Sequence, residues 1–127
     1  MNPKQFLLIG GLILVVVGLL GFAGLIGPTP ESSIFGGSWW FDNGENWAHL
    51  ILGLAALVGL KVLNDGMQRW LVAAVGLLGL VVTVYGFVVG ENLLGANLEN
   101  PADNILHLVI GLWALYAAKK GGEMMQM

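Results

Sequence analysis

Four long apolar segments, separated by shorter polar stretches, run through the chain. The first covers about residues 6–26 and the third about 70–89, close to the roughly 20 helical residues that cross a bilayer core. The second, about 47–63, and the fourth, about 105–118, reach that length only if the polar residues before them extend the helix. The pattern predicts an all-α fold, a four-helix transmembrane bundle in a single domain.

The composition favours lipid as the solvent around these helices. Only 10% of the residues are charged and 57% are hydrophobic, whereas soluble domains carry about 25% charged residues. The five lysines and arginines form no patch for nucleic acid, and no cysteine is present for a disulfide or a thiolate site. There is no Ser/His/Asp set, phosphate loop or strong metal motif, so we predict no enzyme, no catalytic residue and no metal site.

The basic residues occur in three places, and these places predict the orientation of the chain. They precede the first segment, surround the second connection and follow the fourth segment: Lys4, Lys61, Arg69, Lys119 and Lys120. The positive-inside rule puts such places in the cytoplasm. We therefore expect a multi-pass protein of the cell membrane with both termini cytoplasmic and with loops 27–44 and 91–101 outside.

The two halves of the chain align at a constant offset of 58 positions. Asn46 and His49 recur as Asn104 and His107, and the run 17–21 recurs as 75–79. We interpret this as a tandem duplication, with one helix–loop–helix unit at about 4–63, a second at about 64–120, and a mobile tail at 121–127. Both units then enter the membrane in the same direction, which predicts a pseudo-two-fold axis along the membrane normal.

Glycine is frequent, with 20 residues, and several glycines recur at helical spacing. Small residues let helix backbones approach closely in lipid, where packing and interhelical hydrogen bonds drive association. We therefore expect tight helix packing at six glycines: Gly18, Gly21, Gly53, Gly76, Gly79 and Gly111.

A polar motif, [Glu/Asp]-Asn-x-x-His-Leu, opens the second and the fourth helix. Its side chains are three or four positions apart, so on a helix they share roughly one face. We expect that face to turn inward near the outer surface of the membrane. The motif residues are Glu45, Asn46 and His49 in the first copy and Asp103, Asn104 and His107 in the second.

Three interpretations of this motif remain open. In the first, which we favour, His and Asn form hydrogen bonds between helices and no cofactor is bound. In the second, His49 and His107 bind a haem or a chlorophyll-type pigment, or they hold one metal ion with Glu45 and Asp103. In the third, the ionisable groups belong to a proton or ion path, although the inner half of the bilayer offers few polar residues.

The second copy of the motif resembles the signature of an uncharacterised protein family. The stretch 103–112, Asp-Asn-Ile-Leu-His-Leu-Val-Ile-Gly-Leu, is similar to the family's Asn-x-x-His-Leu motif, and 99–104, Glu-Asn-Pro-Ala-Asp-Asn, to its Asn-x-Ala-Asp-Asn lead-in. This family, a domain of unknown function, contains small four-helix membrane proteins of bacteria and archaea. The resemblance covers nearly the whole chain and implies the same four-helix fold, but no known activity. The chain departs from the family in its Trp-rich first loop and its Met-rich tail.

The first outer loop is more apolar than a free loop, with Ile34, Phe35, Trp39, Trp40 and Phe41. We expect it to cap the bundle, to lie on the membrane surface or to contact a partner, because aromatic rings favour the interface. We also expect the loop at 91–101 to pack against it.

These features favour a structural, accessory or assembly subunit of a larger membrane complex, or a homo-oligomer. Its partners would be the lipid bilayer and other membrane proteins or itself. The first alternative is a haem- or chlorophyll-type cofactor-binding protein that uses His49 and His107. The second alternative is a small transporter or proton-path protein.

Overall fold

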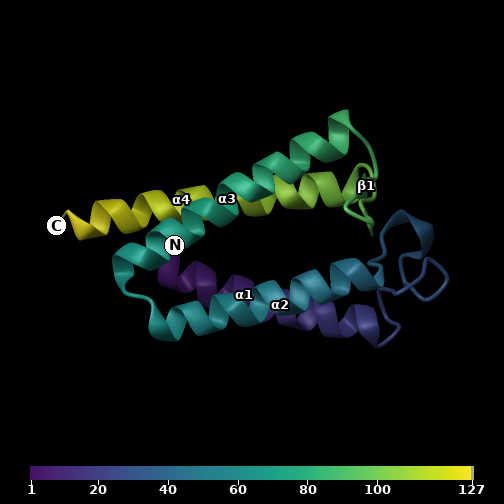
Figure 1. The fold of residues 1–127 in the computed structure, drawn as a ribbon, viewed down its shortest axis with the longest axis horizontal. Coiled ribbons are helices and arrows are strands. Elements are labelled where there is room, and N and C mark those ends of the chain that lie inside the picture. The colour runs from purple at the N-terminus through teal and green to yellow at the C-terminus, as the bar shows by residue number, and fades with distance from the viewer. Residues whose placement is uncertain (127) are drawn as a thin grey trace.

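Four long helices dominate the structure, a computed structural model that describes residues 1–126. Within this range the chain forms α1 (Pro3–Phe22), α2 (Asn43–Val62), α3 (Asp65–Val88) and α4 (Ala102–Met125) (Figure 1). The 3₁₀ helix η1 (Gly36–Ser38) lies between α1 and α2, and the strands β1 (Asn92–Leu93) and β2 (Ala96–Asn97) pair antiparallel between α3 and α4. The all-α class with four helices, predicted from the sequence, is confirmed.

Side-chain caps explain where three of the helices begin. Asn2 caps α1 and Asn64 caps α3, each by accepting a hydrogen bond from the backbone N–H three residues on, at 2.8 Å and 2.9 Å. Asp42 accepts in the same way from the Glu45 N–H at 2.9 Å, so α2 begins four residues before the apolar segment predicted from residue 47. Such caps satisfy N–H groups that have no partner in the first turn of a helix.

The last helix extends farther than the sequence predicts. The tail at 121–127, predicted to be mobile, is helical as far as the end of α4, and position 127 lies outside the described residues. Gly121 packs against Pro3 at the start of α1, and Arg69 donates from Nε to the Ala118 backbone oxygen at 3.0 Å. The polar end of α4 therefore belongs to the packed structure, which corrects the prediction.

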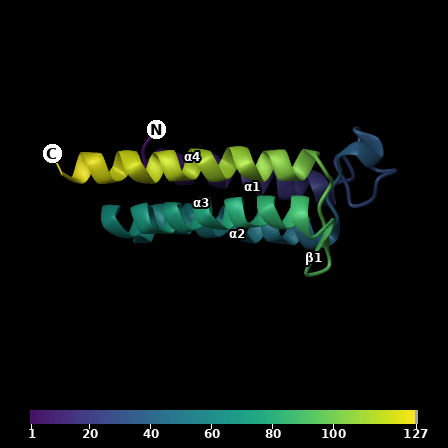
Figure 2. The ribbon, with the colours of Figure 1, turned by 90° about the horizontal axis from the view of Figure 1, so that it is seen from above.

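The helices form two antiparallel hairpins, α1 with α2 and α3 with α4 (Figure 1, Figure 2). Both chain ends and the short α2–α3 turn lie at one end of the molecule, which we call the terminal end. The long connections, residues 23–42 and 89–101, lie together at the opposite end, which we call the loop end. Both hairpins therefore start at the terminal end, and α1 contacts α3 and α4.

The core changes character along the molecule. Near the terminal end it is apolar, with Phe6 and Leu7 packed against Val72 and against three alanines of α4. Phe6 also meets Trp113 edge to face, with ring centroids 4.6 Å apart. Toward the loop end the buried side chains are mostly polar: Glu45, Asn46, Glu99, Asp103 and Asn104, with Phe41 and Leu98.

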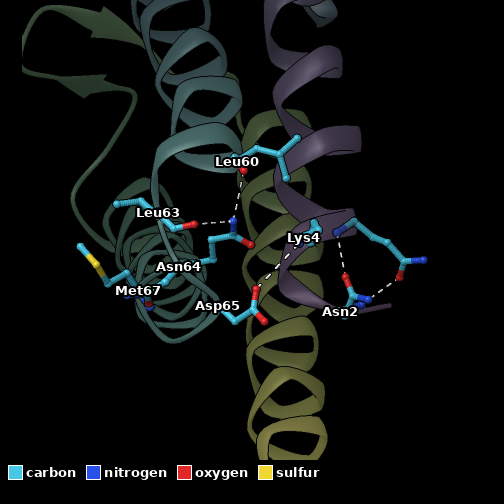
Figure 3. A network of polar contacts seen from close by, with 9 residues as sticks. Asn2, Lys4, Leu60, Leu63, Asn64, Asp65 and Met67 are labelled. Carbon is cyan, nitrogen blue, oxygen red and sulfur yellow. Dashed lines mark hydrogen bonds and ion pairs between the residues drawn. The ribbon is translucent and has the colours of Figure 1, made fainter.

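Polar contacts close the terminal end, as Figure 3 shows. Lys4 Nζ lies 3.8 Å from Asp65 Oδ1, so the starts of α1 and α3 are paired. Gln68 donates from Nε2 to the backbone oxygens of Leu60 and Leu63, at 3.3 Å and 3.0 Å. These bonds satisfy free carbonyl groups at the end of α2 and hold the short turn into α3.

Two of the four described helices, α1 and α3, are long and apolar enough to cross a membrane. Only 28% of the apolar window of each is buried inside the structure, and the rest is exposed or partly exposed. The first turns of α2 and α4 carry the polar motif, which lowers the mean hydropathy of these two helices.

Candidate functional site

Three acidic side chains meet at the loop end. Glu45 comes from the first turn of α2, Glu99 from the residues before α4, and Asp103 from the first turn of α4. One carboxylate oxygen of each lies within 4.8 Å of the others. The three residues expose only 5%, 8% and 0% of their surface, respectively. This group, which we call the carboxylate cluster, connects the first hairpin to the second.

Hydrogen bonds from both hairpins orient two members of the cluster. The Glu45 carboxylate accepts from the Asp42 backbone N–H at 3.0 Å and completes the capping box of α2. Asp103 accepts from the Trp39 indole N–H at 2.9 Å and from the Glu99 backbone N–H at 2.9 Å. The first long loop thus reaches across and holds a carboxylate of α4.

Glu99 is only partly satisfied and has no cationic partner. Its Oε1 accepts from the Asn97 side-chain amide, whereas Oε2 is buried and has no partner within residues 1–126. Both ion pairs found in that range lie at the terminal end. Burial, and then a hydrogen bond and the negative charge of Asp103, raises the pKa of Glu99 to about 9. Burial therefore favours the protonated, uncharged form of Glu99.

The first long loop, residues 23–42, covers the carboxylate cluster. Phe41 is 1% exposed, and the Asn97 backbone N–H, from the second long connection, donates to Asp42 Oδ2 at 2.8 Å. The predictions that the first loop caps the bundle and that the second packs against it are confirmed. Ile34 and Phe35 remain 70% and 49% exposed on the outside of this cap.

The two motif asparagines face glycines within their own hairpins. Asn46 and Asn104 are completely buried. A Cβ atom at Gly21 of α1 would overlap the Asn46 amide, and one at Gly86 of α3 would overlap the Asn104 amide. Asn46 donates from Nδ2 to a backbone oxygen at 3.3 Å, but its Oδ1 and both amide atoms of Asn104 have no partner in the described chain. Neither asparagine side chain makes a hydrogen bond to another helix in the described residues, contrary to the favoured interpretation of interhelical hydrogen bonds.

These asparagine–glycine contacts align the two halves of the chain in a different register from the offset of 58 positions seen in the sequence. Asn46 and Asn104 are 58 positions apart, but their partners Gly21 and Gly86 are 65 positions apart. The constant offset of 58 therefore does not describe how the first helices of the two hairpins pack. The difference of seven residues lies in the connections, because residues 23–42 outnumber residues 89–101.

The two histidines, His49 on α2 and His107 on α4, are both partly buried. His107 Nδ1 lies 2.7 Å from the Asp103 backbone oxygen, so Nδ1 carries the proton and Nε2 keeps its lone pair. His49 packs edge to face on Phe41 at 5.0 Å, and its buried Nδ1 has no partner in residues 1–126. Neither ring belongs to the carboxylate cluster.

The six glycines predicted for helix packing all lie at close approaches. A Cβ atom at Gly53 would lie 2.8 Å from the Gly11 oxygen of α1, and one at Gly111 would lie 3.1 Å from the Gly76 oxygen of α3. An added Cβ atom would also lie close to the backbone of α2 at Gly18 and close to the backbone of α4 at Gly79. Gly21 makes room for the Asn46 amide. These glycines bring helix backbones together within each hairpin rather than between the hairpins.

Sequence reasoning missed three residues that build the site. Asp42 starts α2, Trp39 holds Asp103, and Glu99 completes the carboxylate cluster. Glu99 lies outside the repeated motif, and the position 58 residues earlier is Phe41, so the alignment gives no signal for it. Its spacing of four from Asp103, just before a helix, is the one sequence feature that would have drawn attention to it.

No protein-family model matches this chain, and searches among curated proteins and solved structures find no significant match. The resemblance to the uncharacterised four-helix family therefore stays a prediction. Arguments about function rest on the chain's own residues.

Proposed function

We propose that this chain is a four-span integral membrane protein, built from two tandem helix–loop–helix units, that acts as a structural or accessory subunit of a membrane assembly or of its own oligomer. The main support is that α1 and α3 bury only 28% of their apolar windows and leave large apolar side chains exposed, such as Val16 and Leu19 of α1 and Val81 of α3, at 52%, 53% and 63%. Monomeric soluble proteins rarely expose contiguous apolar patches of that kind. Lipid or another membrane helix is the natural cover.

The lengths of α2 and α4 support two further spans. They contain 20 and 24 residues, which correspond to about 30 Å and 36 Å at 1.5 Å per residue. A bilayer core is about 30 Å thick. The acidic and amide groups in their first turns are buried inside the protein, so they need not meet lipid.

The distribution of charge supports cytoplasmic termini. All five basic residues belong to helix ends or turns at the terminal end, whereas the connections at the loop end carry only acidic charges. An excess of Lys and Arg marks the cytoplasmic side of a membrane protein. The loop end would then face outward, where Ile34 and Phe35 are available to a partner.

Membrane extraction and mass measurement test this proposal. The full chain, expressed with an affinity tag, should stay in the membrane pellet at alkaline pH and leave it only with detergent. In mild detergent it should run as a complex larger than one 13.5 kDa chain, with itself or with other membrane proteins. A protein released by alkaline buffer would refute the membrane proposal, and a strict monomer without partners would refute the accessory role.

A cofactor-binding function is the second candidate, favoured by His107, whose Nδ1 is held by the Asp103 backbone oxygen while Nε2 is left for a ligand. Neutral imidazole with its other nitrogen held by a carbonyl is a common arrangement for metal ligands. Purified protein would then show a haem or pigment absorption band. The band should vanish in both His49→Ala and His107→Ala, and its absence from the wild-type spectrum would remove this candidate.

A transporter or proton path receives less support from the buried polar groups. Within the described residues, the buried polar side chains of α3 are Thr83 and Gln68. Fifteen residues separate them, which is about 22 Å along a helix. A continuous polar route between the two ends would need groups in that interval.

A further inference from the structure

We propose that the carboxylate cluster of Glu45, Glu99 and Asp103 binds a hard divalent cation, with Ca²⁺ the best fit, and that this cation ties the two hairpins together at the loop end. The sequence motif alone gave no such set, because Glu99 lies outside it. The inference is independent of the accessory role proposed above.

The spacing of the oxygens fits one ion. Calcium binds oxygen ligands at about 2.3–2.6 Å, so two ligands on opposite sides of the ion lie at most about 5 Å apart. The three carboxylate oxygens, one from each residue, lie within 4.8 Å of one another, so they can all reach one calcium ion with at most a small inward shift. Magnesium binds at about 2.0–2.1 Å and would have to draw the oxygens closer.

The unsatisfied carboxyl group of Glu99 is the second, independent observation. Glu99 Oε2 is buried without a hydrogen-bond partner in residues 1–126, and the whole residue is only 8% exposed. A buried carboxylate without a partner is costly unless a proton or a cation compensates it. No Lys or Arg occurs in either long connection at this end of the molecule, so the charge is compensated either by a proton on Glu99 or by an added cation.

The surrounding groups suit oxygen ligation rather than nitrogen ligation. The Trp39 indole and the Asn97 amide each donate to a cluster carboxylate and would fix its direction, as outer partners of metal ligands do. The histidine nitrogens lie outside the set of mutually close oxygens. Carboxylate ligands without imidazole favour Ca²⁺, Mg²⁺ or Mn²⁺ over Zn²⁺.

The cation would act as a link between the two halves of the chain. Glu45 belongs to α2 in the first hairpin, whereas Glu99 and Asp103 belong to the second. The apolar contacts that join the hairpins, around Phe6 and Val72, lie near the terminal end. At the loop end the hairpins are joined by the hydrogen bonds of Trp39 to Asp103 and of Asn97 to Asp42, and a bound ion would add a further link there.

Terbium luminescence provides a specific test, because Tb³⁺ replaces Ca²⁺ and is excited through a nearby tryptophan. The Trp39 indole donates directly to Asp103, so Tb³⁺ added to chelator-treated, purified protein in detergent should give sensitised emission. Calcium should displace the signal and should also raise the melting temperature. Trp39→Phe should reduce the emission while the calcium-dependent rise in melting temperature remains measurable.

Glu99→Gln is the decisive variant, since it keeps the shape of the side chain and removes a buried charge. It should fold like wild type by circular dichroism and bind Tb³⁺ and Ca²⁺ at least about tenfold more weakly, as loss of a metal ligand would require. Glu91→Gln, an exposed acid in the same connection, should bind as wild type does.

Three results would overturn the proposal. One is a melting temperature that does not respond to Ca²⁺, Mg²⁺ or Mn²⁺ in the wild type. Another is equal Tb³⁺ affinity in Glu99→Gln and Glu91→Gln. The third is binding of Zn²⁺ alone, lost in His49→Ala and His107→Ala, which would move the ion to the histidines.

Discussion

Single residues at the loop end fit one another so closely that glycine is required opposite each asparagine. The Asn46 amide occupies the space where a side chain at Gly21 would begin, and the Asn104 amide does the same at Gly86. Gly10, on the same helix as Gly21, has no atom closer than 3.8 Å to an added Cβ. Gly21 and Gly86 therefore have a specific packing role, whereas Gly10 reflects only the general abundance of glycine in membrane helices.

Alanine at Gly21 or at Gly86 should therefore destabilise the protein by about 1–3 kcal/mol, the usual cost of overpacking a core. Gly10→Ala should be neutral or slightly stabilising, because alanine favours helix. Unfolding in detergent, followed by circular dichroism, measures the three variants. Gly21→Ala combined with Asn46→Ala should recover part of the loss, since the smaller side chain leaves room for the methyl group. Equal stability of Gly21→Ala and Gly10→Ala would contradict this packing.

The buried carboxyl group of Glu99 should make stability depend on pH when divalent cations are removed. Its pKa is about 9 in the folded protein against an ordinary value of 4.5, mainly because of burial and then because of Asp103. Between these values the native chain keeps a proton that the unfolded chain has lost, so stability falls as the pH rises. The contribution of Glu99 protonation to the free energy of unfolding is complete below about pH 4.5 and is lost as the pH passes 9.

In chelator, the melting temperature should thus decrease from pH 5 to pH 9. Glu99→Gln should flatten this slope, because the amide does not titrate. Glu91→Gln should retain the slope of the wild type. A melting temperature that rises with pH, or an unchanged slope in Glu99→Gln, would contradict the burial of this group.

For single residues, the sequence predicted which side chains belong to the site better than it predicted which residues they contact. The repeated motif correctly drew attention to Glu45, Asn46, Asp103 and Asn104, which are all buried. It did not predict that the asparagines turn toward α1 and α3, because the first helices pack in a register that the alignment of the motif does not give. It also did not predict Glu99, whose position depends on how the loop before α4 folds back over the bundle.

Hydropathy predicted that four helices exist and in which order they occur along the chain. Capping and packing contacts, which hydropathy does not describe, determine where the helices begin and end. α2 begins at its Asp42 cap, upstream of the apolar segment, and α4 continues past the lysines into a stretch with two glycines. Hydropathy indicates the end of a span there, but it carries no information on Pro3 and Arg69, which pack against the extra turns. Tertiary contacts therefore extend α4 beyond what local sequence favours.

A bulky side chain at Gly121 tests the packed end of α4. Gly121→Val should lower the melting temperature, because its Cβ would lie 2.5 Å from Pro3 Cγ. Glu123→Val, two residues further along the same helix and exposed, should leave the melting temperature nearly unchanged. Equal behaviour of the two variants would indicate that this end of α4 is not held by α1.

At the scale of the whole molecule, the proposed four-span topology requires two hairpins that enter the membrane from the same side. The basic residues and the apolar core lie toward the terminal end, and the acidic, aromatic groups lie at the loop end. From this distribution the positive-inside rule predicts that the terminal end faces the cytoplasm and the loop end faces outward. The predicted four-span topology and the proposed repeat both require this asymmetry.

Labelling of single cysteines in intact cells tests this arrangement most directly, and the chain has no cysteine to interfere. Ser38→Cys and Leu94→Cys, both exposed at the loop end, should react with a maleimide that cannot cross the membrane. Asp65→Cys and Glu123→Cys, exposed at the terminal end, should react only after the cells are permeabilised. Reaction of Ser38→Cys and Leu94→Cys from opposite sides, or of all four variants from outside, would contradict two hairpins of like orientation.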